Sequence, residues 1–266
     1  EQMAQPMVAV VNTWSTVTPC NMHLGDLAEP IREGLRGGGA TPVDFNTIVV
    51  SDGITMGGEG MRASLISREI IADSIELAVK GHSLDAAIIL VGCDKTIPAA
   101  AMALARLDIP GLVFYGGTIL PGRLGDRDLS IQDVFEAVGA HAKGDMSDSE
   151  LDQVERAACP GAGACGGQFT ANTMAMALAM MGISPMGSGD PPATNAAKKV
   201  EAARCGRLAA KLAHEGTSAR TFLTPTSLRN AATAVVASGG STNAVLHLPA
   251  IAAEAGFAFP IETFDE

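Results

Sequence analysis

The chain has 266 residues, of which 47% are hydrophobic and 18% are charged, and its formal net charge is −11. This composition supports a sizeable core and excludes a disordered protein, while the acidic balance argues against nucleic acid or an anionic membrane as a partner. The five cysteines are an odd number in a long chain, which favours reduced thiols in a cytoplasmic protein, or an organellar one in a eukaryote, over a disulfide scaffold.

Four short apolar runs in the first half of the chain are predicted to be buried strands, at residues 8–11, 47–50, 87–91 and 112–115. Each run is continuously apolar rather than alternating, which is typical of parallel strands covered on both faces. Helical patterns lie between them, at residues 23–36, 61–80 and 98–107. The alternation of strand and helix predicts an α/β fold, with a parallel sheet flanked by helices in three layers.

The rest of the chain is predicted to be a mostly helical C-terminal annex. No strand is expected after about residue 125, and helical patterns occupy residues 130–143, 147–158, 170–181, 194–214, 225–237 and 242–255. Ser130 is predicted to be the N-cap of the first of these helices. We expect one domain over residues 1–266, with a possible sub-boundary between residues 125 and 190. No apolar run reaches the roughly 18 residues of a membrane-spanning helix, so no membrane partner is expected.

Polar residues follow the predicted strands at the edge of the sheet where ligands of parallel sheets usually bind. Cys20 comes after the first strand and Asp52 after the second, while Cys93, Asp94 and Lys95 come directly after the third. We therefore expect thiols and carboxylates to converge on one edge of the sheet.

A further thiol, Cys165, lies in the glycine-rich stretch 159–167. Thr170 is predicted to cap the following helix, and a position just before a helix N-terminus favours the thiolate, which is the form that binds metals. Three widely spaced cysteines are unlike the compact pattern of ferredoxins. Three thiolate ligands would leave one iron of an iron–sulfur cluster open as a Lewis acid, which suits dehydration better than electron transfer.

Each of these residues also has an ordinary structural interpretation. A single cysteine is more often a small buried hydrophobic residue, and this is the preferred reading of Cys205 and of Cys159. Asp52 precedes Gly53 as in a turn. Asp94 and Lys95 could form a surface ion pair of little energetic value.

Taken in order, the motifs of this chain resemble those of the dihydroxy-acid and sugar-acid dehydratase family. They are TPCNMHL (18–24), SDGI (51–54), EGMR (59–62), SRE (67–69), GCDK (92–95), the stretch 159–167, TANTM (170–174), GGSTNA (239–244) and HL (247–248). The resemblance covers nearly the whole chain. It implies an iron–sulfur and magnesium-dependent hydro-lyase that dehydrates a 2,3-dihydroxy carboxylate, its small-molecule substrate, to a 2-keto acid.

The resemblance also implies the cofactor ligands. Cys20, Cys93 and Cys165 match the cluster ligands, and a cysteine at position 20 resembles the [2Fe–2S] branch, with [4Fe–4S] as the alternative. The sequence around Cys20, PCNMHL (19–24), is more similar to that of the dihydroxy-acid enzymes of branched-chain amino-acid biosynthesis than to that of the sugar-acid enzymes.

The magnesium site follows from the same resemblance. Asp52, Asp94 and a carbamylated Lys95 match the Mg²⁺ ligands, which suits the preference of this ion for oxygen donors. The helix start at Ser241 and Thr242 could hold the substrate carboxylate, although a simple N-cap is equally compatible with these residues.

Family members are roughly twice as long as this chain. Their C-terminal β-rich domain, which supplies a further Mg²⁺ ligand and the serine base, has no counterpart in these residues, so no catalytic base is assigned here. We expect a truncated domain that is inactive alone and that belongs to a homodimer. The alternatives are a sugar-acid dehydratase, a non-catalytic iron–sulfur redox or metal-binding module, and a purely structural α/β domain.

Overall fold

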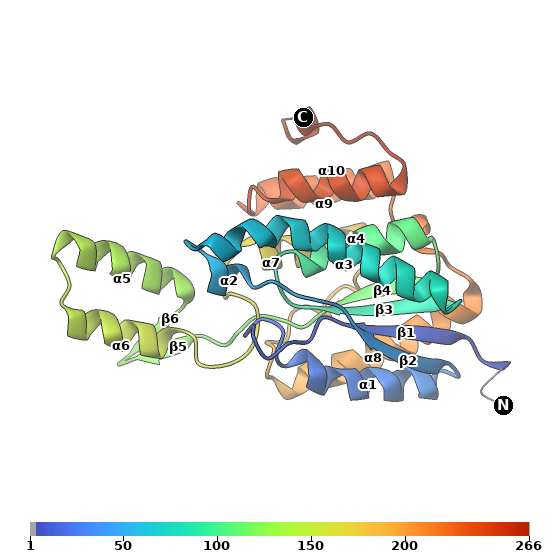
Figure 1. The fold of residues 1–266 in the computed structure, drawn as a ribbon, viewed down its shortest axis with the longest axis horizontal. Coiled ribbons are helices and arrows are strands. Elements are labelled where there is room, and N and C mark those ends of the chain that lie inside the picture. Colours follow the sequence, from blue (N-terminus) through green and yellow to red (C-terminus); the bar gives the residue numbers. More distant parts are fainter. Residues whose placement is uncertain (1–3, 266) are drawn as a thin grey trace.

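A four-stranded parallel sheet forms the centre of the computed structural model, which describes residues 4–265 (Figure 1). The strands, in spatial order, are β2 (Thr41–Asn46), β1 (Met7–Asn12), β3 (Ala86–Val91) and β4 (Gly111–Tyr115). Along β1, Val8 and Val10 belong to one hydrophobic core, whereas Ala9 and Val11 belong to the other. The central strands are thus buried on both faces, as their continuous apolar runs predict, and the three-layer α/β class is confirmed.

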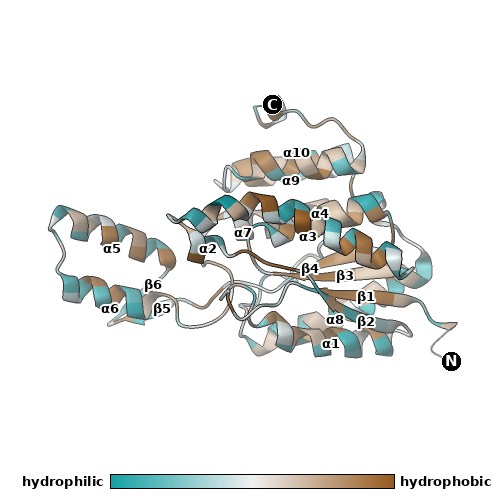
Figure 2. Ribbon diagram, viewed as in Figure 1, coloured by the Kyte–Doolittle hydropathy of each residue, from teal (hydrophilic) through white to brown (hydrophobic). Residues whose placement is uncertain are grey.

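Helices cover both faces of this sheet (Figure 1). One layer holds α1 (Leu24–Gly37) and α8 (Ala196–Glu215), and the other holds α3 (Arg62–Gly81), α4 (Thr96–Leu107) and α7 (Thr170–Met181). Helices α9 (Pro225–Ala237) and α10 (Ala244–Ala255) pack on the outside of this second layer, against α7 and α4. The helices of the predicted annex therefore contribute to both layers. Figure 2 shows hydrophobic residues concentrated in the central strands and hydrophilic residues on outer helices such as α1 and α6. Among residues 4–265, no helix is both long and apolar enough to cross a membrane.

An arm projects to one side of the three layers (Figure 1). It consists of the antiparallel hairpin β5 (Gly122–Leu124) and β6 (Arg127–Leu129), followed by α5 (Ile131–Lys143) and α6 (Asp148–Ala158). The prediction that strands end at about residue 125 is wrong here, because strands of three residues are too short to show a pattern. The Ser130 hydroxyl does accept a hydrogen bond from the Gln132 N–H, so the predicted N-cap is confirmed.

The predicted strand at residues 47–50 is also wrong. The strand that pairs with β1 is residues 41–46, with Thr41 opposite Met7 and Asn46 opposite Asn12. It lies at the edge of the sheet, where Pro42 is tolerated and one face stays partly exposed, so the strand needs no continuous apolar run. The apolar residues after it leave the sheet, and Ile48 is 52% exposed. Two short helical turns follow, α2 (Asp52–Thr55) and η2 (Glu59–Met61).

Helices α1 and α8 cross where two glycines allow their backbones to touch. A Cβ atom on Gly34 would overlap the Ala203 carbonyl oxygen, whereas a Cβ atom on Gly37, in the same helix, would meet nothing within 4 Å. We expect Gly34→Ala to lower the free energy of unfolding by about 1–3 kcal/mol through overpacking. Gly37→Ala should leave this free energy unchanged or raise it by up to about 1 kcal/mol. Urea unfolding of both variants checks this, and equal effects would contradict the close approach.

Candidate active site

The loops after β1 and β3 meet at the carboxyl edge of the sheet. Strands β1 and β3 are neighbours in the sheet. After β1 the chain moves outward to β2, and after β3 it moves outward in the opposite direction to β4. Such a reversal creates the crevice in which open α/β sheets bind ligands. The first loop carries Cys20 and the second carries Cys93. A Cβ atom on Gly92 would overlap the Cys20 carbonyl oxygen, so glycine is required for this contact. The Asn21 side-chain amide stabilises the first loop by donating a hydrogen bond to the Thr13 carbonyl at 3.0 Å.

The structure brings Cys20, Cys93 and Cys165 together. The Cys20 thiol lies within interaction range of both other thiols, and all three residues line one cavity. The neighbouring thiols of Cys165 and Cys93, with burial, raise the pKa of Cys20, while the neighbouring Cys20 thiol lowers the pKa of Cys165. Three soft sulfur ligands grouped in this way are suited to a thiophilic metal centre.

Backbone pairing with the end of β4 positions Cys165. The Ala164 N–H donates to the Gly117 carbonyl at 3.0 Å, and Ile119 donates back to Ala164 at 2.8 Å. The Asn172 side chain donates to the Cys165 carbonyl at 2.9 Å. Cys165 lies shortly before α7, as predicted, but the N-cap of this helix is Phe169 rather than Thr170.

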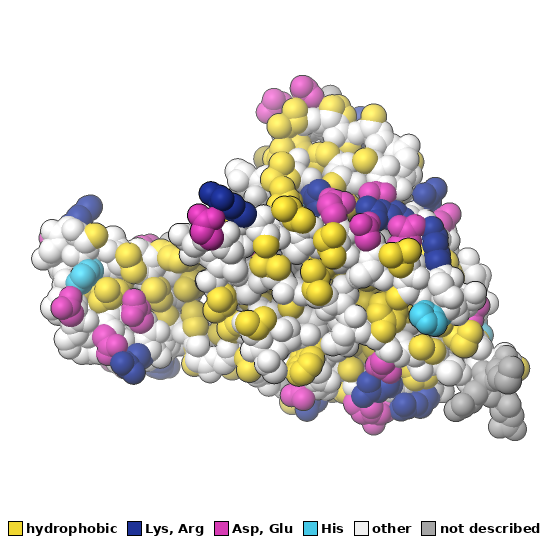
Figure 3. Space-filling view, in the orientation of Figure 1, with side chains coloured by type: hydrophobic (Ala, Val, Ile, Leu, Met, Phe, Trp, Pro, Cys, Tyr) yellow, Lys and Arg dark blue, Asp and Glu magenta, His cyan; other side chains and the backbone are white. Residues whose placement is uncertain are grey.

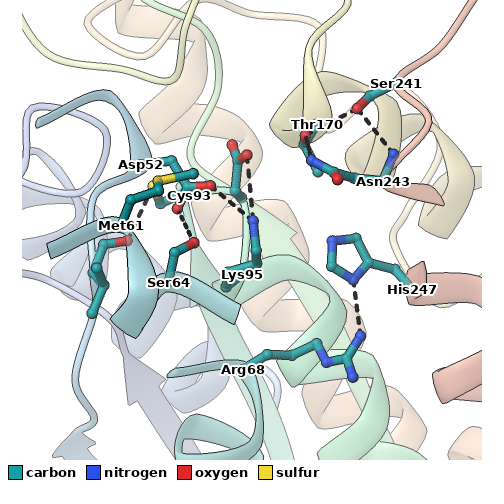
Figure 4. A network of polar contacts seen from close by, with 12 residues as sticks. Asp52, Met61, Ser64, Arg68, Cys93, Lys95, Thr170, Ser241, Asn243 and His247 are labelled. Atoms are coloured by element: carbon teal, nitrogen blue, oxygen red, sulfur yellow. Dashed lines mark hydrogen bonds and ion pairs between the residues drawn. The ribbon is translucent and has the colours of Figure 1, made fainter. Parts of the chain in front are cut away.

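Asp52, Asp94 and Lys95 form a compact charged group, and the two carboxylates line the same cavity as the thiols. Figure 4 shows Asp52 and Lys95 next to Cys93. The Lys95 Nζ lies 2.8 Å from an Asp52 oxygen and 3.8 Å from an Asp94 oxygen, and the side chains of Lys95 and Asp52 are 7% and 8% exposed. Ser64 donates to the other Asp52 oxygen at 2.5 Å. Burial, followed by the negative charge of Asp52, raises the pKa of Asp94 to about 6. The sequence-based alternative of a surface ion pair between Asp94 and Lys95 is therefore excluded. The two carboxylates, of Asp52 and Asp94, face the single ammonium of Lys95, and their excess negative charge suits a hard divalent cation.

The donor set is compatible with an iron–sulfur cluster and Mg²⁺. Within residues 4–265, no three His, Cys, Asp or Glu side chains surround a point that could hold one metal ion. A cluster would not need such convergence, because it contains more than one iron. Magnesium usually takes only one or two carboxylates from the protein and completes its shell with other oxygens.

The start of α10 contributes polar groups to the same cavity. Ser241 and Asn243 line it, whereas Thr242 is exposed and is not among the lining residues. The helix begins at Ala244, two residues later than predicted. The Asn243 amide donates to the Thr170 hydroxyl at 2.7 Å, and Thr170 in turn is hydrogen-bonded to Asp94. Sequence reasoning did not assign Asn243 or Thr170 to the site, although both lie in motifs that carry the resemblance.

The cavity has a volume of about 410 Å³ and walls that are largely apolar. The apolar lining residues are Ile54, Met56, Met61, Ile119, Ile131, Phe135 and Phe169. Two of them, Ile131 and Phe135, come from the arm, and Figure 3 shows hydrophobic side chains where the arm meets the body. A polar floor of thiols and carboxylates is thus enclosed by hydrophobic walls.

The two remaining cysteines differ in position. Cys205 is fully buried within the hydrophobic core between α8 and the sheet, which confirms its structural interpretation. Cys159 is exposed and lies at the cavity. His23 is buried and donates from its Nε2 to the Gly116 carbonyl at 3.0 Å, which fixes the end of β4.

A contact that the sequence did not reveal, between a partly buried arginine and a buried histidine, lies beside Lys95 (Figure 4). Arg68 of α3 contacts the Nδ1 of His247 of α10 at 3.1 Å and donates to the Leu246 carbonyl at the same distance. His247 is fully buried, and burial lowers its pKa to about 3, with further contributions from Arg68 and Lys95. The Nε2 of this ring has no hydrogen-bond partner among the described residues.

Lys198 ties the loop before α8 to the end of β4, and its burial predicts a pH dependence of stability. Its Nζ donates to the Ser188 carbonyl at 2.8 Å and to the Tyr115 carbonyl at 3.3 Å. Burial lowers the pKa of Lys198 from 10.5 to about 8. Between these values the unfolded chain binds more protons at this residue, so its contribution to the free energy of unfolding rises with pH. As the pH rises from about 8 to 10.5, the free energy of unfolding of the parent should increase by up to about 3 kcal/mol relative to that of Lys198→Met. Urea unfolding at several pH values measures both. A difference between the two proteins that does not change with pH would contradict the lowered pKa.

Comparisons with known proteins agree with one another. The family model described as "Dihydroxy-acid/6-phosphogluconate dehydratase N-terminal" matches residues 5–266. The chain is 55% identical over 266 residues to the dihydroxy-acid dehydratase of Koribacter versatilis, covering 100% of this chain and 46% of that relative. For the dihydroxy-acid dehydratase of Mycobacterium tuberculosis, the identity is 48% over 269 residues, covering 99% of this chain and 47% of that relative. The chain therefore spans about half the length of the curated relatives it matches.

Proposed function

Because the chain belongs to the dihydroxy-acid/6-phosphogluconate dehydratase family, we propose that it is the N-terminal part of a hydro-lyase that converts a 2,3-dihydroxy carboxylate to a 2-keto acid. The observation that carries this proposal is the convergence of three thiols, two carboxylates and a lysine at one cavity. A redox module would need the thiols but would have no use for the buried group of Asp52, Asp94 and Lys95. A purely structural domain would need neither.

Cys20, Cys93 and Cys165 would hold the cluster, [2Fe–2S] or [4Fe–4S], and Asp52, Asp94 and a carbamate on Lys95 would hold Mg²⁺. When bound, these groups supply an open iron as a Lewis acid for the departing hydroxyl and a magnesium ion that binds hard oxygen atoms of the substrate.

The residues around the metal ligands bind and orient the substrate. Ser241 and Asn243 present polar groups from the start of α10, where a carboxylate is electrostatically favoured. The apolar walls exclude water from the floor of the cavity, which strengthens the electrostatic interactions there. Burial, followed by repulsion from Asp52, raises the pKa of Asp94, and a bound cation at this position would favour the charged carboxylate.

The apolar walls favour a branched alkyl substrate over a sugar acid. An aldonate carries additional hydroxyl groups, which would lose their water partners against side chains such as Ile54, Ile131 and Phe135. A dihydroxy acid with a short alkyl end would bury that end there instead. We therefore assign the activity to branched-chain amino-acid biosynthesis, in a cytoplasmic homodimer, with a sugar acid as the alternative substrate.

The experiment is an anaerobic assay of the protein extended to the length of its relatives. We expect it to contain iron, sulfide and magnesium, to show a cluster signal by electron paramagnetic resonance, and to turn over 2,3-dihydroxyisovalerate in preference to aldonates. A cluster without dehydratase activity would indicate the redox module, and absence of iron and sulfide would indicate the structural domain.

The 266-residue chain by itself is expected to lack this activity, because a further magnesium ligand and the base are assigned to the part that only the longer relatives contain. Robust turnover of 2,3-dihydroxyisovalerate by this chain alone would refute that assignment.

A further inference from the structure

The hydrogen bond from Arg68 fixes the protonation of His247. A guanidinium group can only donate, so the His247 Nδ1, at 3.1 Å, must accept and cannot carry a proton. The ring is therefore neutral, and its single N–H is on Nε2. This tautomer follows from the contact geometry alone.

The Nε2–H of His247 is a buried donor without an acceptor. The side chain is fully buried, and no described residue accepts from this nitrogen. Figure 4 shows the nitrogen turned away from Arg68, toward the space between Lys95 and Thr170. A buried donor of this kind normally has a partner, so its orientation indicates an acceptor that belongs in this space.

Neither neighbour provides that acceptor. The Lys95 ammonium can only donate, and it is directed at Asp52. The Thr170 hydroxyl already accepts from Asn243 and is hydrogen-bonded to Asp94 and Ser241. Two donors, on Lys95 and His247, therefore border the same space.

We propose that His247 is a positioning residue that holds a carbamate on Lys95 by donating from Nε2–H to a carbamate oxygen, with Arg68 fixing the required tautomer. This inference rests on the proposed function, in which Lys95 carries that group. Addition of CO₂ would replace the donor at the end of Lys95 by two acceptor oxygens, one of which could meet the ring. The imidazole then orients the carbamate without adding a charge.

The modification balances without any reagent other than dissolved CO₂. The Lys95 ammonium loses one proton to solvent, and the free nitrogen lone pair attacks the carbon of CO₂. A nitrogen–carbon bond forms, one carbon–oxygen π pair moves onto oxygen, and the nitrogen releases a second proton. No oxidation or reduction occurs.

The test is a titration of the chain with ¹³C-bicarbonate in the presence of Mg²⁺, followed by carbon NMR. Trapping with a trialkyloxonium salt and peptide mass spectrometry then locates the carbamate, and Lys95→Arg identifies its signal. We expect His247→Leu to raise the bicarbonate concentration needed for half-modification by about tenfold or more, as for loss of a hydrogen bond to a charged group. His247→Gln, which keeps an N–H near the Nε2 position, should stay close to the parent.

Two further variants separate positioning from folding. His247→Asn keeps a polar group near Nδ1 but is too short to reach Lys95, so it should behave like His247→Leu while retaining the contact with Arg68. His214→Leu alters an exposed histidine that contacts the Gly38 carbonyl in another part of the molecule, and it should leave the titration unchanged. Circular dichroism and thermal unfolding confirm that each variant is folded.

The outcomes distinguish this inference from the proposed function. A parent chain without any carbamate would overturn the modification of Lys95 itself. A parent chain with a carbamate that His247→Leu and His247→Asn retain at the same bicarbonate concentration would overturn the role of His247, and would assign its Nε2–H to a water molecule.

Discussion

Replacing Cys93 with alanine is expected to leave the chain with less than about a tenth of the parent's iron and inorganic sulfide after anaerobic reconstitution. Cys93 is 2% exposed and lies beside the Cys20 thiol at the junction of the loops after β1 and β3. Removing one of three thiolates leaves two ligands, which are too few to retain a cluster against loss to solvent. Iron and sulfide analysis, with the visible absorption spectrum, measures the effect.

The matched control is Cys205→Ala, which removes a buried sulfur from the hydrophobic core of α8. This variant should keep the iron and sulfide content of the parent, and urea unfolding measures its stability separately. Cys159→Ser tests the remaining cysteine at the cavity, and it should also keep the cluster. Loss of iron from Cys159→Ser, with retention in Cys93→Ala, would reverse the ligand assignment.

Asp52→Asn is expected to act on both stability and magnesium binding. In the metal-free chain it breaks the buried ion pair with Lys95, and loss of one partner from such a pair costs about 3–5 kcal/mol of unfolding free energy. In the parent, Mg²⁺ at about 100 times its dissociation constant should add about 2.7 kcal/mol. The variant should gain little from the same concentration, because a carboxylate ligand is lost. Urea unfolding with and without Mg²⁺ measures both effects.

Asp44→Asn provides the comparison for this experiment. Asp44 also pairs with a cation, Arg32, at 2.8 Å, but on the surface, where its side chain is 42% exposed. This substitution should cost at most about 1 kcal/mol and should leave the stabilisation by Mg²⁺ intact. If Mg²⁺ stabilises Asp52→Asn as strongly as it stabilises the parent, Asp52 is not a magnesium ligand.

The buried strands could be predicted from the sequence, whereas the edge strand and the hairpin could not. Residues 87–91 and 112–115 are apolar throughout because helices cover both of their faces, so burial leaves a direct pattern. The strand at 41–46 is held by backbone pairing with β1 on one side only, and its mixed side chains carry no such pattern. The apolar run at 47–50 was the stronger signal, but it belongs to a loop.

The site could be predicted where its residues follow buried strands, as Cys93, Asp94 and Lys95 do. Such residues reach the same edge of the sheet whatever their distance along the chain. The contact between Arg68 and His247 joins residues 179 positions apart on two helices, and neither helix shows it alone. It arises only when α10 packs on the outside of the layer that contains α3 and α4.

The arm separates two tasks that many enzymes assign to the same residues. The groups expected to perform the chemistry are rooted in loops at the sheet, while Ile131 and Phe135 belong to a segment inserted between β4 and the loop of Cys165. Substitutions in this segment are therefore expected to change the shape of the cavity wall while the thiols and carboxylates of its floor stay in place.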